Sequence, residues 1–511
     1  MIKKVIAFLL IVVISSNCFA TESVEHYLKG LLYGRSGNLR SAIEEYQKTI
    51  VLDPQSVILH KELAELYLRL GEVNKARAEL KEAMVLAPDD LQALLLWANI
   101  SQMLEEDQQA IEAYKRILSL DKENQESLLY LGNLYLQSEN YEQAIKYFEK
   151  FLTFNPDNEE IHFSLGLIYE RLNRIEEAVK AYNTAVEINP HYFMALFSLA
   201  QLYVTQKKFP LAVTAYQRCA NLEPNNTAIL FQLGSLYYQQ NNLPLAKKTF
   251  QRILKINPKE VISHYALGII YSLEKNFSAA IEEFEAIARL KKDIPETYLH
   301  LGYLYTQNKQ LKKAVQALVL VTQLTPDNAE NWFFLALGYE DLKKWSKAEE
   351  AFRKVIKINP NYEEAYFHLG ALAEKFNRMK EAEEYFLKLI TLNPKSASGY
   401  NYLGYSWADR GMKLKEAEKF ILKAVELEPQ NGAYLDSLGW VFYRLGKYPE
   451  ALEKLEKAAQ LTNDPTIYEH LADTCWQLGK KEEALKFWQK SLQLDPKNRS
   501  LRKKLRKRGN K

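Results

Sequence analysis

The chain has few of the residues and none of the motifs that usually carry covalent or metal chemistry. Its 511 residues include three cysteines and eight histidines. No His-Glu-x-x-His segment, Gly-rich phosphate loop, Gly-x-Ser-x-Gly turn or Cys-x-x-Cys pair occurs in it. Zinc proteases, nucleotide-binding enzymes, hydrolases and thiol redox proteins use these spacings. The sequence therefore predicts no enzyme, with no catalytic residue, cofactor, metal ion or small-molecule substrate.

The chain also lacks an excess of either charge. Lys and Arg number 67 against 64 Asp and Glu, and 47% of the residues are hydrophobic. These values are typical of a folded soluble protein, so they favour neither disorder nor a membrane-embedded body.

The N-terminus has the composition of a secretory signal. Lys3 and Lys4 precede an apolar run over residues 5–14, and small or polar residues follow to Ala20. A basic segment, a short apolar segment and a small-residue site define such a signal, so residues 1–20 are predicted to be cleaved after Ala20. We then expect the protein to be exported, either periplasmic or associated with the outer envelope. Two alternatives stay open: a lipoprotein modified at Cys18, and a membrane anchor formed by residues 5–14.

The C-terminus is basic. Residues 499–511 contain eight Lys and Arg and no acidic residue, with Leu501 and Leu505 four apart. The pattern predicts a capping helix or tail whose basic face is solvated. The alternative is contact between Arg499–Lys511 and an anionic membrane surface. Nucleic acid is not expected as a partner of an exported protein.

Small residues and prolines recur with one period along the chain. Proline occurs at spacings of 34 residues or twice that: Pro54, Pro88, Pro156, Pro190, Pro224, Pro258, Pro326, Pro360 and Pro394. A Gly or Ala lies 24 residues before each of these prolines and before positions 122, 292 and 428, which continue the same spacing without a proline. These residues are Gly30, Ala64, Ala98, Gly132, Gly166, Ala200, Gly234, Gly268, Gly302, Ala336, Gly370 and Gly404, continued out of step by Gly439 and Ala472. We call this residue the anchor of its repeat.

A second small residue follows each anchor after about twelve positions, and it is always alanine: Ala42, Ala76, Ala110, Ala144, Ala178, Ala212, Ala246, Ala280, Ala314, Ala348, Ala382, Ala417, Ala451 and Ala484. Apolar residues around both small positions follow the i, i+3, i+4, i+7 spacing of a helix face. Between them stands a residue that tolerates the left-handed conformation in many units: Gly37, Gly71, Gly411, Gly446, Gly479, Asn173, Asn241 or Asn377. The repeat is therefore predicted to be two helices whose backbones approach closely at small residues.

A 34-residue helix-turn-helix with Leu-Gly-x-x-Tyr, then Ala, then Pro resembles the tetratricopeptide repeat, as in Leu165, Gly166, Tyr169, Ala178 and Pro190. The resemblance implies an all-α fold, a right-handed superhelical α-solenoid of about fourteen repeats over residues 21–498. The departures are few: Lys122, Lys292 and Asn463 at proline positions, and Cys219 where a small Ala is usual. In such a stack only neighbouring repeats touch, so Cys219 and Cys475 are predicted to be separate buried side chains.

The register places the remaining polar and aromatic residues. Tyr lies three after the anchor in nine repeats and is predicted to pack between helices: Tyr33, Tyr67, Tyr135, Tyr169, Tyr203, Tyr237, Tyr271, Tyr305 and Tyr339. Histidines share two positions, His26, His60, His162 and His264 four before the anchor and His300, His368 and His470 two before it. A fixed position favours packing or exposure over metal binding. Acidic pairs such as Glu44-Glu45 and Glu349-Glu350 are predicted to lie on solvated faces.

The resemblance implies that first helices line a concave groove, with groove positions six and three before the anchor and one, four and five after it. The position three before holds aromatic residues that form a possible partner-binding stripe: Tyr27, Phe163, Phe197, Phe231, Tyr265, Phe333 and Phe367. The alternative is that these rings only pack against neighbouring helices.

Near the C-terminus the candidate partner-binding residues are polar, acidic or large aromatic: Asp409, Asp436, Trp440, Tyr443, Arg444, Asp473 and Trp476. Trp and Tyr beside charge are typical of interaction hot spots. Residues 401–410 and 434–443 are similar to the ends of exported bacterial envelope-associated repeat proteins. We therefore expect a non-catalytic scaffold in the cell envelope that binds proteins or peptides and assists envelope assembly, secretion or polysaccharide export. The alternative is a signal-anchored inner-membrane regulator with a cytoplasmic array.

Overall fold

The computed structural model describes residues 22–508, and within them the chain is all-α, without a strand. The predicted signal segment 1–20 and its cleavage site lie outside the described residues, as does the end of the basic tail at 509–511. Within 22–508, no helix combines the length and apolar character that crossing a bilayer requires.

The helices alternate between first and second helices of successive repeats. The first helices are residues 22–35, α3 (Val57–Arg69), α5 (Leu91–Met103), α7 (Gln125–Gln137), α9 (Glu159–Arg171), α11 (Phe193–Thr205), α13 (Thr227–Gln239), α15 (Val261–Leu273), α17 (Pro295–Gln307), α19 (Ala329–Asp341), α21 (Glu363–Lys375), α23 (Ala397–Asp409), α25 (Gly432–Arg444) and α27 (Pro465–Gln477). The second helices are α2 (Leu39–Leu52), α4 (Val73–Leu86), α6 (Asp107–Leu120), α8 (Tyr141–Leu152), α10 (Ile175–Ile188), α12 (Phe209–Leu222), α14 (Leu243–Ile256), α16 (Phe277–Leu290), α18 (Leu311–Leu324), α20 (Trp345–Ile358), α22 (Met379–Leu392), α24 (Leu414–Leu427), α26 (Tyr448–Leu461) and α28 (Lys481–Leu494). A last helix, α29 (Arg499–Arg508), follows α28.

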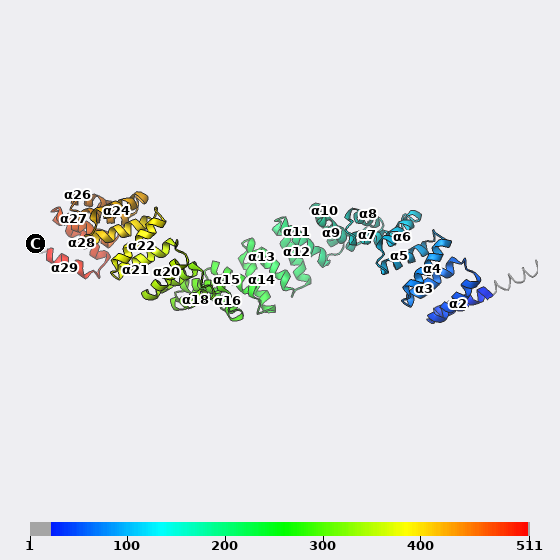
Figure 1. The fold of residues 1–511 in the computed structure, drawn as a ribbon. Helices are drawn as coiled ribbons and strands as arrows, with labels where there is room; N and C mark the ends of the chain where they lie inside the picture. Colours follow the sequence, from blue (N-terminus) through cyan, green and yellow to red (C-terminus); the bar gives the residue numbers. More distant parts are fainter. Residues whose placement is uncertain (1–21, 509–511) are drawn as a thin grey trace, which may run out of the picture. The chain divides into compact units, whose positions relative to one another are not determined.

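The described residues form two compact units, residues 22–249 and 250–508. In each unit a first helix packs mainly on the second helix of its own repeat, and that second helix packs on the next first helix. Figure 1 shows this order for α2 to α12, where each helix lies beside the next one along the chain. The predicted all-α repeat architecture is therefore confirmed.

The small residues explain how closely the two helices of a repeat approach. All fourteen repeat alanines are at most 2% exposed. A ring from the second helix lies directly over the anchor glycine: a Cβ added to Gly268 would lie 2.6 Å from Phe284, and one added to Gly370 would lie 2.7 Å from Phe386. Since real Cβ atoms do not come so close, glycine makes room for the ring, as the sequence predicted.

The turn inside each repeat uses a left-handed residue seven positions after the anchor. The eight glycines and asparagines predicted there have positive φ, and so do Glu105, Glu139, Lys207, Lys275, Lys309 and Lys343. The one-residue insertion after Gly404 lies in this turn, where Lys413 takes a second positive φ of 43° before α24 begins. The insertion therefore leaves the helices intact.

The repeated tyrosines and histidines connect helices through polar contacts. The Tyr67 hydroxyl accepts from Gln47 at 2.8 Å and the Tyr169 hydroxyl bonds Glu149 at 3.1 Å, in each case across 20 residues to the preceding repeat. His60 Nδ1 lies 2.8 Å from Glu79, and its Nε2 lies 3.3 Å from the Pro54 carbonyl oxygen. The predicted packing role of these positions is confirmed there, although Tyr33 is exposed.

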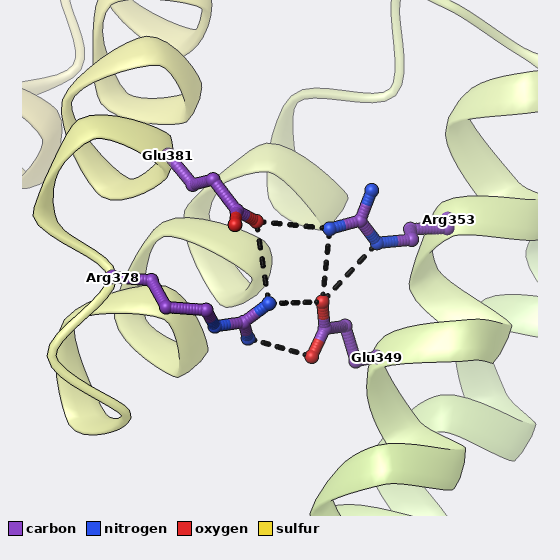
Figure 2. Close-up of polar contacts among 4 residues, drawn as sticks. All are labelled: Glu349, Arg353, Arg378 and Glu381. Carbon is purple, nitrogen blue, oxygen red and sulfur yellow. Dashed lines mark hydrogen bonds and ion pairs between the residues drawn. The ribbon is translucent and has the colours of Figure 1, made fainter.

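Both of the acidic-pair predictions are wrong in part. Glu350 is exposed, but Glu349 is half-buried and belongs to a four-residue charge network between α20 and α22 (Figure 2). Arg378 donates to both Glu349 carboxylate oxygens at 2.8 and 2.7 Å, and Arg353 donates to Glu349 and Glu381. Likewise Glu45 is half-buried and bonds His26 and Lys48, whereas Glu44 is exposed. Because a base from a neighbouring segment, His26 or Arg378, adds to one from the same helix, the inner member of each pair is not fully solvated.

The two cysteines of the described residues are both buried and unpaired, and burial raises the pKa of each thiol to about 11. At the C-terminus, α29 packs on α28 through Leu501, which is fully buried, and Leu505. Its outer face leaves Arg499, Arg502, Lys503, Arg506 and Lys507 exposed.

Candidate functional site: the first-helix face

In the first unit, the rings three before the anchor are half-buried and lie on rings of the second helix. Phe163 packs against Tyr182 and Tyr192, with ring centroids 5.5 and 5.4 Å away, and Phe197 packs against Tyr216 at 6.1 Å. Tyr27 stacks on Tyr46 at 5.7 Å. Phe231, at the same position of α13, is also half-buried. Each ring is thus supported on one side, and part of its surface faces solvent.

The second unit repeats this arrangement with histidine as an added partner. The Tyr265 hydroxyl lies 3.0 Å from His300 Nε2, and Phe333 and Phe367 each make an edge contact with His368. Burial lowers the pKa of His300. Tyr265 is exposed, whereas Phe333 and Phe367 are half-buried. The continuation of the stripe from Phe231 to Tyr265 runs from one unit to the other and stays a prediction.

Exposed apolar side chains occupy other groove positions of the same helices. In the first unit, Met194 lies six before its anchor and is 51% exposed, and Leu167 lies one after its anchor and is 39% exposed. Together with the half-buried Phe163 and Phe197, these two residues place several accessible apolar groups at groove positions of α9 and α11. Exposed apolar side chains are typical of interaction sites where they form a continuous patch.

Near the C-terminus, the first helix α25 contacts the first helices α23 and α27 directly. Asp436 of α25 and His470 of α27 are buried between them, with carboxylate oxygens 3.0 and 3.2 Å from His470 Nδ1. The Trp440 ring stacks on His470 at 4.1 Å and on Tyr443 at 4.8 Å. His470 was assigned to packing by its position, and the structure shows it at the centre of this cluster.

Arg444 completes the cluster on the α23 side. Its guanidinium donates to the Asp409 backbone carbonyl and lies over the Trp440 ring at 5.8 Å. Burial raises the pKa of Tyr405 on α23, and the Asp409 and Asp436 carboxylates raise it further. The structure therefore brings together Asp409, Asp436, Trp440, Tyr443 and Arg444.

Asp473 and Trp476 lie in a second group, formed with the last two helices. Asp473 accepts from Trp488 Nε1 at 2.9 Å and from Lys504 of α29, and Trp476 packs against Trp488 with centroids 5.4 Å apart. These side chains hold α28 and α29 in place.

Three buried polar atoms of α23 and α25 have no hydrogen-bond partner among residues 22–508: Asn401 Oδ1, Ser406 Oγ and Trp440 Nε1. An unsatisfied buried polar group costs about 1–3 kcal/mol, so water or a bound partner is the expected source of the missing bonds.

Sequence reasoning missed a pocket of about 460 Å³ beside α17 and α19. Its apolar lining is Leu299, Gly302, Tyr303, Leu318, Phe334, Leu337 and Gly338, and its polar lining is Glu296, His300, Thr306 and Asp341. Six of these stand at the expected groove positions. In the repeats of α17 and α19 only Phe333 had been singled out for partner binding, and it does not line the pocket, so the pocket was not predicted.

Among the described residues, no group of three His, Cys, Asp or Glu side chains could hold a metal ion. The geometry of residues 22–508 is that of an α-solenoid of helix-turn-helix repeats, in which several first helices carry exposed apolar residues at groove positions.

Family models agree with this description. Models described as tetratricopeptide repeats match residues 27–90, 108–159, 131–193, 163–227, 203–267, 295–328, 329–362 and 363–396. A model of subunit 3 of the anaphase-promoting complex, or cyclosome, matches residues 411–491. The chain is therefore a tetratricopeptide-repeat protein. No curated protein sequence matches it significantly.

Solved structures show partial likeness. The MamA protein is 27% identical over 34% of this chain and 94% of its own, with a TM-score of 0.31. YrrB, described as a tetratricopeptide-repeat protein with an unusual peptide-binding site, is 18% identical over 36% of this chain and 95% of its own, with a TM-score of 0.32. The Cut9-Hcn1 hetero-tetramer structure is 16% identical over 96% of this chain and 98% of that one, with a TM-score of 0.39.

Proposed function

We propose that this protein is an exported, envelope-associated scaffold that binds partner proteins or peptides on its first-helix face. The observation that carries the proposal is the set of accessible apolar groups at groove positions of α9 and α11, where Met194 and Leu167 stand beside half-buried rings. Repeat solenoids commonly use such extended surfaces for binding. The protein would assist envelope assembly, secretion or polysaccharide export by holding components together.

Export is supported by the sequence of residues 1–20, with its two lysines, apolar run and small-residue site. N-terminal sequencing of the protein from envelope fractions tests it. A first residue of Thr21 supports export with cleavage. An intact N-terminus with the repeats accessible only from the cytoplasm would instead support the anchored regulator.

Binding is tested by capture from envelope extracts with matched variants. The Met194→Glu/Leu167→Glu double variant places charge on the first-helix face at positions that are already exposed, so the fold should be kept. The control is Leu211→Glu, which changes a 49%-exposed residue of the second helix α12. The double variant is expected to lose the captured proteins and the control to keep them. Equal capture by all three proteins would contradict the proposed face.

Contact of α29 with anionic lipid is a separate, secondary part of the proposal. Five exposed Lys and Arg residues on α29 favour it, although Lys504 is already paired with Asp473 and Glu469. Sedimentation with vesicles containing phosphatidylglycerol tests it, and an unchanged bound fraction after Arg502→Gln/Arg506→Gln would contradict it.

A further inference from the structure

The pocket beside α17 and α19 exists because one repeat lacks a side chain that most others have. Two residues after the anchor, eleven repeats carry Leu, Ile or Val. At this position α19 carries Gly338, a glycine inside a helix. A glycine there costs helix stability relative to a larger residue, and here it opens part of the first-helix face.

A second departure enlarges the same space. Ten repeats carry an aromatic ring four residues after the repeat alanine, and the repeat of α17 and α18 carries Leu318 instead. His300 and His368, two before their anchors, stack on such rings, Phe284 and Phe352. Phe334 stands at the equivalent position of α19 and lines the pocket with Leu318, so no ring fills the space beneath it. The pocket therefore has an apolar lining in which Leu318 stands in place of a ring and two residues, Gly302 and Gly338, have no side chain.

The rim is acidic. Glu296, Glu330 and Glu364 are exposed and stand at the same groove position in α17, α19 and α21. Asp341, also exposed, lines the pocket with Glu296. Neither α17 nor α19 contains a Lys or Arg. An apolar pocket beside a row of exposed carboxylates is complementary to an apolar side chain flanked by positive charge.

We propose that this pocket receives a leucine- or phenylalanine-sized side chain from a basic segment of a partner protein, whose Lys or Arg residues face Glu296, Asp341 and Glu330. The inference rests on the proposed scaffold function and names the chemistry of one partner. A segment is favoured over a small molecule because the acidic row extends past the pocket to Glu364. The exposed Tyr303 and Phe334 rings would cover the bound side chain.

The test uses the full chain and short fluorescent synthetic peptides with a central leucine or alanine, flanked by lysines or glutamates. Binding is measured by fluorescence anisotropy at two salt concentrations. The leucine peptide with lysines is expected to bind, and the alanine peptide to bind about 10-fold more weakly, since burying a leucine side chain is worth roughly a factor of ten or more. The glutamate peptides are expected not to bind.

Gly338→Leu is the decisive variant. It restores the residue type of eleven other repeats. The added Cβ would lie 3.0 Å from Val315 and 3.4 Å from Leu318, so the Val315 side chain must move by a few tenths of an ångström. The variant is expected to keep its melting temperature and to lose leucine-peptide binding by about 10-fold or more. Glu296→Gln/Asp341→Asn should weaken binding and reduce its salt dependence while leaving the preference for leucine over alanine.

Equal binding to wild type and Gly338→Leu, equal binding of lysine and glutamate peptides, or no binding of any peptide would overturn the proposal. So would binding of N-acetyl-leucinamide as tight as that of the leucine peptide, which would indicate a small-molecule site. The scaffold function is tested separately at Met194 and Leu167, in the other unit. Retained capture of envelope proteins by Gly338→Leu together with failed peptide binding would reject the pocket alone.

Discussion

The repeats from α9 to α12 and those from α23 to α27 share one register but place their polar groups differently. In α9 to α12 the interior holds small residues and rings, and polar contacts lie at the edges, such as Tyr182 to Glu170 at 2.9 Å. In α23 to α27 the Asp436–His470 pair is buried between first helices. Apolar packing thus suffices for the regular repeats, whereas the C-terminal repeats depend on a specific set of polar partners.

The largest expected effect comes from removing one partner of that buried pair. His470→Leu leaves the Asp436 carboxylate without its imidazole partner, and breaking a buried pair in this way costs about 3 kcal/mol. The unfolding free energy of the C-terminal repeats is measured by native-state hydrogen exchange, because a repeat array need not unfold in one step.

The matched control is His162→Leu in α9, whose Nε2 bonds the Pro156 carbonyl oxygen at 2.9 Å near the surface. This variant should lower the unfolding free energy by less than about 1 kcal/mol. Equal losses of unfolding free energy in the two variants would contradict the difference between the two regions.

A smaller effect is expected from overpacking the regular region. Ala178 is fully buried where α10 crosses α9, so Ala178→Leu should destabilise those repeats by about 1–3 kcal/mol. Glu176→Leu, at an exposed position of the same helix, should change stability by no more than about 0.5 kcal/mol. Thermal unfolding followed by circular dichroism measures both, and an unchanged Ala178→Leu protein would mean that the register is wrong there.

The charge network between α20 and α22 should contribute less to the unfolding free energy, and its contribution should depend on pH. Arg378 and then Arg353 hold the pKa of Glu349 below its ordinary value, against the opposing effect of burial. Stabilisation by Glu349 is therefore present above the unfolded-state pKa and is lost as pH falls through the folded-state pKa.

Glu349→Gln is expected to cost about 1 kcal/mol at pH 7, discounted for partial exposure. The mutant and wild-type unfolding free energies should converge as the pH is lowered below about 4, since Glu has an ordinary pKa of about 4.3. A difference that stays constant with pH would mean that the carboxylate charge is not the cause.

The smallest effect concerns the turns. Lys207, after α11, has φ of 57°, whereas the C-terminal turns use glycines such as Gly446 with φ of 78°. Since left-handed backbone costs L-residues about 1–2 kcal/mol and glycine costs entropy, Lys207→Gly should stabilise by about 0.5 kcal/mol. Gly446→Lys should destabilise by a similar amount, and Lys180→Gly inside α10 should destabilise by about 1 kcal/mol. A loss of stability in Lys207→Gly would contradict this account of the turn.

The regular part of the fold could be predicted because its cause is local and repeated. Each anchor and each repeat alanine marks a helix crossing, so residue spacing alone located the helices and the buried Tyr and His positions. The inner acidic residues Glu45 and Glu349 could not be placed this way, because one base of each, His26 or Arg378, comes from a different segment of the chain.

The candidate site was less accessible to sequence reasoning. Aromatic residues at one groove position were easy to recognise, but the pocket at Gly338 depends on what two adjacent repeats lack. Comparing each repeat with the others at every position would have shown Gly338 and Leu318 as departures. The Asp436–His470 contact depends on how closely α25 and α27 approach, which the period of the sequence does not determine.

The most direct test of the central claim is site-specific photo-crosslinking in envelope extracts. A photoreactive phenylalanine is placed at Met194 or Leu167 on first helices and at Leu211 on a second helix, all exposed positions. Crosslinks to partner proteins from Met194 and Leu167, and none from Leu211, are the predicted result. Partner crosslinks from Leu211 alone, or equally from all three positions, would contradict binding on the first-helix face.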